Sequence, residues 1–186
     1  MKSLAVFLIA LTALAQSPDR LKAKVAAMLK ADQDNPPTAE GVLFVGGGPV
    51  EGWDLRRYFG AYRTANRGIS GSRISDATYY ADQIIVPFKP STIVVCLTDD
   101  DTIDAFTKFV AKIHQSLPKS LIVVMMDKPG PMNDRLDQIA GQDKLVRPAD
   151  LLDPVKDYDL VSPMLKLVIQ KAETRYWRGF DPVPGQ

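Results

Sequence analysis

Hydrophobic residues along this chain follow two alternating patterns. Short, continuously apolar runs bounded by turn residues predict strands buried on both faces, and they lie at residues 42–45, 91–97 and 121–126. Residues 61–69 carry a further predicted strand, and 144–151 a fifth, weaker one. Between these runs, apolar residues three or four positions apart predict amphipathic helices. This alternation predicts a three-layer α/β/α sandwich, flavodoxin-like, whose mostly parallel sheet has about five strands.

The helical pattern recurs in six segments. The predicted helices cover residues 18–31, 53–59, 74–85, 102–116, 133–140 and a final segment marked by Met164, Leu165, Val168, Ile169 and Ala172. The first helix has a serine cap at Ser17, a proline in its first turn and an acid near its amino end, and we expect it to lie on the sheet. Residues from about 177 onward contain two prolines and two glycines and are predicted to form a surface tail.

Composition limits the classes of function. The chain has 186 residues, 46% hydrophobic and 24% charged, which predicts one globular domain with a sizeable core. Lysine and arginine total 23 against 22 aspartates and glutamates, so no excess of positive charge favours nucleic acid as a partner. The single cysteine, Cys96, lies in an apolar run and can form no intramolecular disulfide, which favours a small buried hydrophobe over a reactive thiol.

The first fifteen residues have the pattern of a secretory signal peptide. Lys2 is followed by an apolar run over residues 4–14, and Ala13-Leu14-Ala15 is a small-x-small cleavage site. We therefore expect cleavage after Ala15, before Gln16, and a secreted or periplasmic protein without a transmembrane segment. Residues 16–186 would then form the single domain. No cysteine follows the cleavage site, which argues against lipid attachment.

The stretch GVLFVGGGPVEGW, residues 41–53, is the most informative part of the sequence. A buried strand here runs directly into three glycines and a proline, at the strand end where open α/β sheets keep their active sites. The sequence VLFVGGGPVEGWDL resembles the first block of the SGNH (GDSL-type) hydrolases. In that family the strand ends in Gly-Asp-Ser or Gly-Ser-Ser, and the serine is the nucleophile. Gly48 occupies the serine position here.

Three further segments resemble blocks of the same family. The loop over residues 66–72 matches the second block, and Gly71 corresponds to the glycine whose backbone N–H donates to the oxyanion hole. Thr98 to Asp101 occupies the place of Gly-x-Asn-Asp, so Asp100 replaces the asparagine donor. Asp157 matches the acid of the family's Asp-x-x-His, and Leu160 stands where the histidine base would be. The resemblance implies ester hydrolysis of carbohydrate or lipid substrates, with no cofactor and no metal.

The replacements predict that this chemistry has been lost. Glycine offers no nucleophile, leucine accepts no proton, and a carboxylate at Asp100 would repel the anion that an oxyanion hole stabilises. The only histidine, His114, falls twelve residues into a helix that starts at the site edge, roughly 18 Å along the axis at ~1.5 Å per residue. The sequence therefore predicts a pseudo-esterase or binding protein rather than an enzyme, with a small molecule or carbohydrate as its ligand.

Two alternatives remain open. An active ester hydrolase could use Ser70 or Ser72 together with one of the nearby aspartates, which are Asp99, Asp100, Asp101 and Asp159. A cation- or sugar-binding module could instead use the acidic cluster of residues 99–101 with Asp157 and Asp159. Turn and cap chemistry explains serines and aspartates at such positions equally well.

Overall fold

The computed structural model describes residues 18–37, 39–128, 130, 132–149, 155 and 157–180, and for 175–180 it describes the backbone alone. The expected signal peptide and the last six residues of the expected tail lie outside this description. The chain divides into two compact units, with the boundary between Pro36 and Pro37. In the described residues, no helix is both long and apolar enough to cross a membrane.

The amino-terminal unit is helical. A 3₁₀ turn, η1 (Pro18–Leu21), leads into α2 (Lys22–Asp34), which confirms the helix expected from residue 18 and extends it slightly. Asn35 leaves the helical region at φ −140° and its N–H donates to the Ala31 carbonyl oxygen. A following proline disfavours helical geometry at the residue before it, so the helix stops there.

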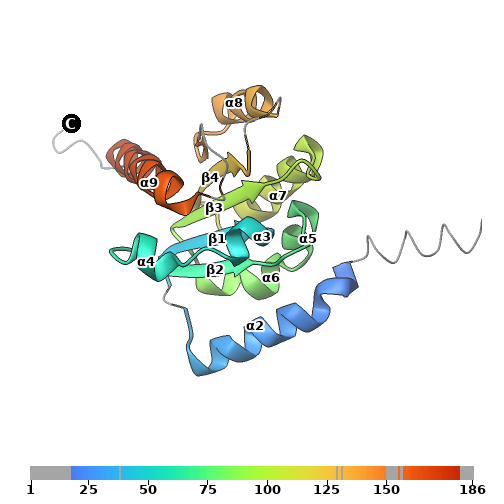
Figure 1. Ribbon diagram of the computed structural model, residues 1–186. Coiled ribbons are helices and arrows are strands. Elements are labelled where there is room, and N and C mark those ends of the chain that lie inside the picture. The colour runs from blue at the N-terminus through green and yellow to red at the C-terminus, as the bar shows by residue number, and fades with distance from the viewer. Residues whose placement is uncertain are drawn as a thin grey trace, which may run out of the picture. The chain divides into compact units, whose positions relative to one another are not determined.

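The second unit contains one parallel sheet of five strands, as the sequence predicted (Figure 1). Its strands are β1 (Val42–Gly46), β2 (Thr64–Gly68), β3 (Thr92–Leu97), β4 (Leu121–Met126) and β5 (Val146–Pro148). Their spatial order is β2-β1-β3-β4-β5, and every neighbouring pair is parallel. The sequence pattern predicts the strand at residues 42–45 as the central one, flanked by those at 61–66 and 91–97. Strand β1 does lie between β2 and β3, but β3 is the middle strand of the five.

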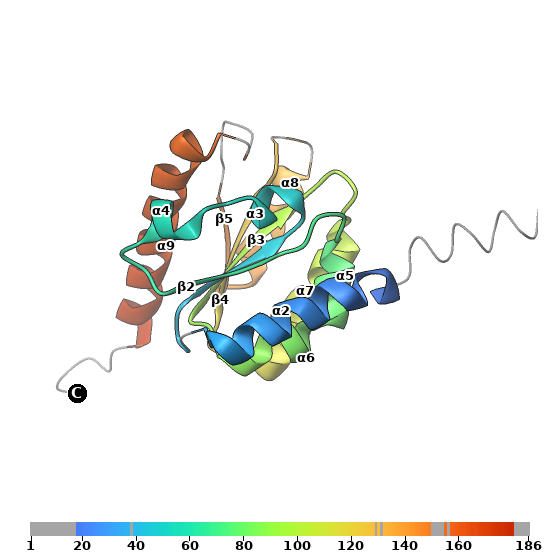
Figure 2. The same cartoon turned by 60° about the horizontal axis from the view of Figure 1, so that its bottom comes forward.

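Helices cover both faces of the sheet. The helical elements of this unit are α3 (Gly48–Glu51), α4 (Leu55–Phe59), α5 (Ile74–Tyr79), α6 (Ala81–Ile84), η2 (Val86–Phe88), α7 (Ile103–Ser116), α8 (Asn133–Gln142) and α9 (Tyr158–Phe180). Figure 2 shows α4 and α9 on one face and α5, α6 and α7 on the other. This is the three-layer α/β/α sandwich that the sequence predicted.

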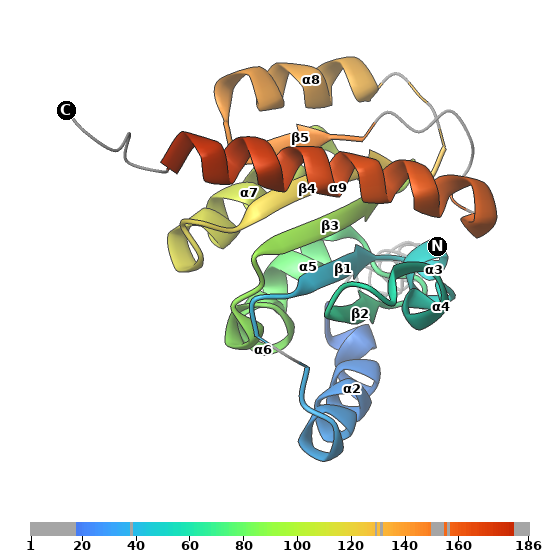
Figure 3. The same ribbon diagram turned by 90° about the vertical axis from the view of Figure 1, so that its left-hand side faces the viewer.

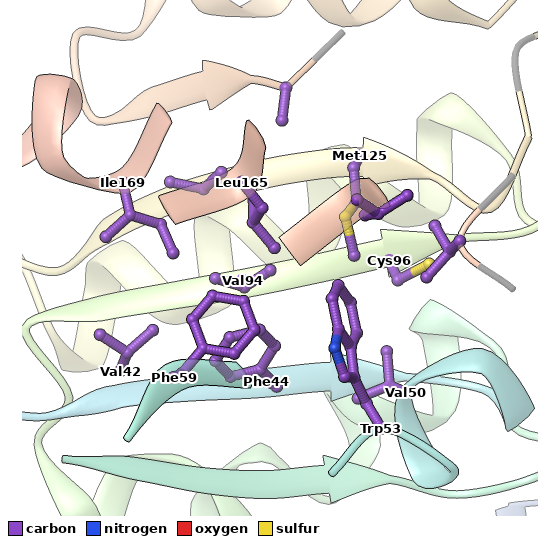
Figure 4. Close-up of a cluster of buried hydrophobic side chains, with 14 of the residues drawn as sticks. Val42, Phe44, Val50, Trp53, Phe59, Val94, Cys96, Met125, Leu165 and Ile169 are labelled. Atoms are coloured by element: carbon purple, nitrogen blue, oxygen red, sulfur yellow. The ribbon is translucent and has the colours of Figure 1, made fainter. Parts of the chain in front are cut away.

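The core between the sheet and α9 is aromatic at its centre. The rings of Phe44, Trp53 and Phe59 are 4.9 to 5.7 Å apart, with tilted or edge-on contacts. Leu165 and Ile169 of α9 close this cluster from the other side (Figure 4). The Trp53 Nε1–H, buried in this cluster, donates to Ser162 Oγ at 3.0 Å. The core thus fixes the segment after β1 against α9.

Two predicted helices differ in their bounds. The helix expected over residues 74–85 is divided at Tyr80, although Tyr80 N still donates to the Asp76 carbonyl and Ile84 N to the Tyr80 carbonyl. The last helix begins at Tyr158, well before Met164, and continues to Phe180, into the segment expected as a tail. The exposed Pro163 lies inside this helix. A proline usually ends or kinks a helix, so the sequence around Pro163 favours a later helix start than the structure has.

Candidate functional site

The candidate site lies at the edge where the parallel strands end. Figure 3 shows the strands pointing the same way, with α3 beyond the tip of β1. Gly48 begins α3, Gly71 lies in the loop after β2, and Asp100 lies in the turn after β3. Asp157 directly precedes α9, whose first residue, Tyr158, contacts α3. Gly48, Gly71 and Asp100 therefore follow three adjacent strands to one edge of the sheet, and Asp157 lies next to the residue that joins α9 to α3.

Close packing of glycines lets α3 fold back across the strand ends. A Cβ on Gly68, the last residue of β2, would lie 2.2 Å from the Glu51 backbone nitrogen. Gly46 ends β1 with a φ of +159°, and a Cβ there would lie 2.7 Å from Val50 Cγ2 and 2.9 Å from the Cys96 carbonyl oxygen. Side chains at these two positions would push α3 off the sheet. The glycine-rich end of β1 is therefore explained by packing as well as by any site.

Gly48 differs from these two glycines because it has room for a side chain. Its nearest neighbour is the hydroxyl of the exposed Ser70, whose Oγ would lie 3.3 Å from a Cβ at position 48. Ser72, the other candidate serine, donates from its Oγ to the Gly46 carbonyl oxygen at 3.1 Å. The structure thus brings Ser70 beside the position of the family's nucleophile, whereas Ser72 has a structural hydrogen bond.

Gly71 lies in a sharply turned loop. Its φ of +81° is in the left-handed region that favours glycine, and a Cβ there would meet no atom within 4 Å. Ser72 N donates to the Ile69 carbonyl oxygen across the turn. The residue at this position is therefore determined by backbone conformation rather than by side-chain packing.

The aspartates after β3 do not act as one cluster. Asp101 is buried, accepting from Ile74 N at 2.7 Å through Oδ1 and from Thr98 N at 2.9 Å through Oδ2. Asp99 forms an exposed ion pair with Lys128 at 2.5 Å, and Asp100 is exposed in the turn between them. Across the described residues, no group of three histidine, cysteine, aspartate or glutamate side chains could hold a metal ion. Asp99 and Asp101 therefore tie loops together.

Asp157 and Asp159, at the start of α9, both make structural contacts. Asp157 Oδ1 accepts the Leu160 N–H at 3.2 Å, as a helix cap does, and the Leu160 side chain is 53% exposed. Asp159 accepts from Tyr58 Oη at 3.0 Å and pairs with Arg57 at 3.3 Å. The Asp159 carboxylate therefore joins α4 to α9 at the protein surface.

Tyr158 is the residue of this turn that faces α3, and the sequence did not identify it. Its hydroxyl donates to the Pro49 carbonyl oxygen at 2.8 Å, and its ring stacks on Trp53 at 5.1 Å. Burial raises the pKa of the Tyr158 phenol above its usual value, so the group is neutral at pH 7. A neutral phenol cannot take the place of the histidine base. The signal available in the sequence was an aromatic residue directly after Asp157.

Asp127 is a second residue at this edge that the sequence did not identify. It follows β4 directly, and its N–H donates to the Leu97 carbonyl oxygen at 2.7 Å. Its Oδ1 is buried and has no hydrogen-bond partner among the described residues. Burial, and then the neighbouring charge of Asp99, raise the pKa of this carboxyl. The signal in the sequence was an aspartate immediately after a buried strand, where open α/β sheets place functional residues.

His114 lies away from the candidate site, as the helix geometry predicted. It is in the last turn of α7, which begins after the carboxyl end of β3 and leads to the amino end of β4. Its Nδ1 is 3.2 Å from Asp143 Oδ2, in the turn between α8 and β5. His114 therefore belongs to the opposite edge of the sheet and cannot serve as a base at Gly48.

Comparison with known proteins identifies similar structures but no similar sequence. No family model matches the sequence, and no curated protein matches it. A GDSL-like lipase from Bacteroides thetaiotaomicron has a similar structure, with a TM-score of 0.61 at 16% identity over 85% of this chain and 98% of that one. A family 3 carbohydrate esterase from Clostridium thermocellum gives 0.57 at 12% identity, over 73% of this chain and 98% of the other.

A third similar structure was co-crystallized with a ligand. It is a two-domain esterase active on acetylated mannans, co-crystallized with mannopentaose, with a TM-score of 0.56 at 17% identity. The match covers 83% of this chain and 54% of the esterase. Identities this low establish a shared fold and nothing about activity. Together with the parallel five-stranded sheet and the short helix that follows β1, they show that this chain has an SGNH-hydrolase-like fold.

Proposed function

We propose that this chain is an exported, non-catalytic SGNH-fold protein that binds a small molecule or carbohydrate at the carboxyl edge of its sheet. The observation that carries the proposal is the pair Gly48 and Leu160. Position 48 lies directly after β1 at the start of α3 but has no side chain, and position 160 has an exposed leucine. These two positions support a site that keeps the backbone of an esterase without its nucleophile or base.

The neighbouring groups do not replace the missing chemistry. A serine hydroxyl becomes a useful nucleophile only when an adjacent base accepts its proton. Tyr158, which contacts α3 from α9, is neutral at pH 7, and burial raises its pKa further. His114 is paired with Asp143 at the other edge. A negative Asp100 at the family's oxyanion position would oppose the transition state instead of stabilising it.

The ligand class follows from the polar groups that remain and from the fold. Asp100, Asp157 and Ser70 are exposed at this edge, and oxygen acceptors of this kind suit the hydroxyl groups of a sugar. The mannan esterase, which shares the fold, was co-crystallized with mannopentaose. An oligosaccharide is therefore the first ligand to test.

The proposal that the protein is exported rests on the sequence pattern from Lys2 to Ala15.

Hydrolysis of p-nitrophenyl acetate tests the absence of catalysis. The wild type should not exceed a buffer control after rigorous purification, because no activated nucleophile is present. Gly48→Ser should also remain inactive, although the site has room for the serine. Restoring three family residues together, Gly48→Ser with Asp100→Asn and Leu160→His, gives turnover only if the triad geometry survives, since such residues act as a unit. Wild-type turnover that copurifies with the protein would overturn the proposal.

Ser70 supports a second candidate, an ester hydrolase with relocated chemistry. Its hydroxyl oxygen lies only 3.3 Å from the Cβ that a residue at position 48 would carry. If Ser70 is a nucleophile, diisopropyl fluorophosphonate should label the wild type, and Ser70→Ala should abolish both labelling and turnover. Ser91→Ala, at the amino end of β3, is the matched control and should change neither.

A further inference from the structure

A groove of about 770 Å³ lies at the amino edge of the sheet, opposite the candidate site. It is formed by the segments that precede β1, β3 and β4, together with α9, and Figure 3 shows the loops into β3 and β4 at this end. Its polar lining includes Glu40, Lys89, Ser91, Ser116, Lys119 and Glu173. This volume is in the range of about 300–1,000 Å³ that is typical of small-molecule sites.

Two lining residues have an unfavourable backbone conformation. Glu40 and Lys89 have φ values of 62° and 44°, and in the described part of the chain they are the only residues other than glycine with positive φ. Lys89 caps the 3₁₀ turn η2, a position that usually carries glycine. The two turns are joined by the Glu40 N–H, which donates to the Lys89 carbonyl oxygen at 3.3 Å. Strain of this kind is concentrated at functional sites in proteins.

The side chains at these strained positions are charged, and they do not pair with each other. Within the described residues, Glu40, Lys89 and Lys119 have no ion-pair partner. The Glu173 carboxylate accepts a hydrogen bond from Thr92 Oγ1 at 2.8 Å, and its negative charge adds to burial in raising the pKa of Tyr62. The groove therefore presents two ammonium groups and two carboxylates whose charges are not neutralised by one another.

We infer that this groove binds a small zwitterion, namely a free amino acid or a short peptide with both termini free. Lys89 and Lys119 would bind its carboxylate, and Glu40 and Glu173 its ammonium group. The hydroxyl groups of Ser91 and Ser116 can bond to amide groups, while Val86 and Leu117 supply apolar contact for a side chain. The inference uses the edge opposite Gly48, so it stands apart from the proposed function.

The dipeptide alanyl-leucine, titrated into ¹⁵N-labelled full-length protein, is the probe. The free dipeptide should shift the amide signals of Ser91 and Ser120, and calorimetry should give a saturable isotherm. The N-acetylated dipeptide and the dipeptide amide, each lacking one charge, should bind at least tenfold more weakly. Cellobiose, a neutral polyol, should produce no shift. Equal shifts with all four compounds, or none at millimolar dipeptide, would overturn the inference.

Variants separate binding from folding. Glu173→Gln keeps an acceptor for Thr92, and Lys89→Gly relieves the left-handed strain, so both should fold. Lys89→Gly should raise the melting temperature and yet weaken dipeptide binding at least tenfold, a combination that a merely structural lysine would not give. Lys144→Ala, outside the groove, should leave binding unchanged. Unaltered affinity in both groove variants would refute the assignment.

Discussion

Individual glycines have opposite roles in this fold, and substitution should reveal the difference. A Cβ on Gly68 would lie 2.2 Å from the Glu51 backbone nitrogen, so Gly68→Ala must displace α3 from β2 and should cost about 3 kcal/mol. Gly141 lies in α8 with open space around it, so Gly141→Ala should stabilise the protein by about 0.5–1 kcal/mol. Urea unfolding of both variants measures these changes. A Gly68→Ala protein as stable as the wild type would contradict the packing of α3 described above.

At the scale of elements, the candidate site depends on the attachment of the α3–α4 segment to α9. The buried hydrogen bond from Trp53 Nε1 to Ser162 Oγ joins residues 109 positions apart. Ser162→Ala leaves the indole N–H unpaired in the core and should cost about 1–3 kcal/mol. Thr174→Ala, on the exposed part of the same helix, should change the free energy of unfolding by less than about 0.5 kcal/mol.

A double-mutant cycle with Trp53→Phe isolates that contact. Phenylalanine has no N–H, so adding Ser162→Ala to Trp53→Phe should cost less than the same change in the wild type. Circular dichroism is the suitable probe, because Trp53 fluorescence changes with the substitution. Additive losses would show that the two side chains stabilise the fold independently and that α9 is held to α4 by other contacts.

For the molecule as a whole, the only cysteine reports on cooperative unfolding. Cys96 is 2% exposed in the middle strand β3, and burial raises the pKa of its thiol far above the usual value. A disulfide reagent such as Ellman's reagent should therefore label the native protein only when the sheet opens. The labelling rate should rise with urea concentration with the slope of global unfolding, and Gly68→Ala should accelerate it. Rapid labelling in buffer, independent of urea, would mean that β3 is exposed by local opening.

The sequence determined the strands because burial on both faces requires continuous apolar runs. The runs at residues 91–97 and 121–126 coincide with β3 and β4, and the pairing of β1 between β2 and β3 was also predicted. The helix α3 was not predicted, because three glycines and a proline have low helix propensity and indicate a loop. Its formation depends on contact with the end of β2, which local sequence does not encode.

Motif spacing also determined which edge of the sheet holds the candidate site. Gly48, Gly71 and Asp100 follow strand ends in the sequence, and parallel strands bring such positions to one edge. Only the tertiary structure decided that Tyr158, rather than Leu160, faces α3, and that Ser70 lies beside position 48. The groove at the amino edge is likewise tertiary, since Glu40, Lys119 and Glu173 come from distant segments. Periodicity specifies which residues are buried within an element, whereas contacts between elements depend on how those elements pack.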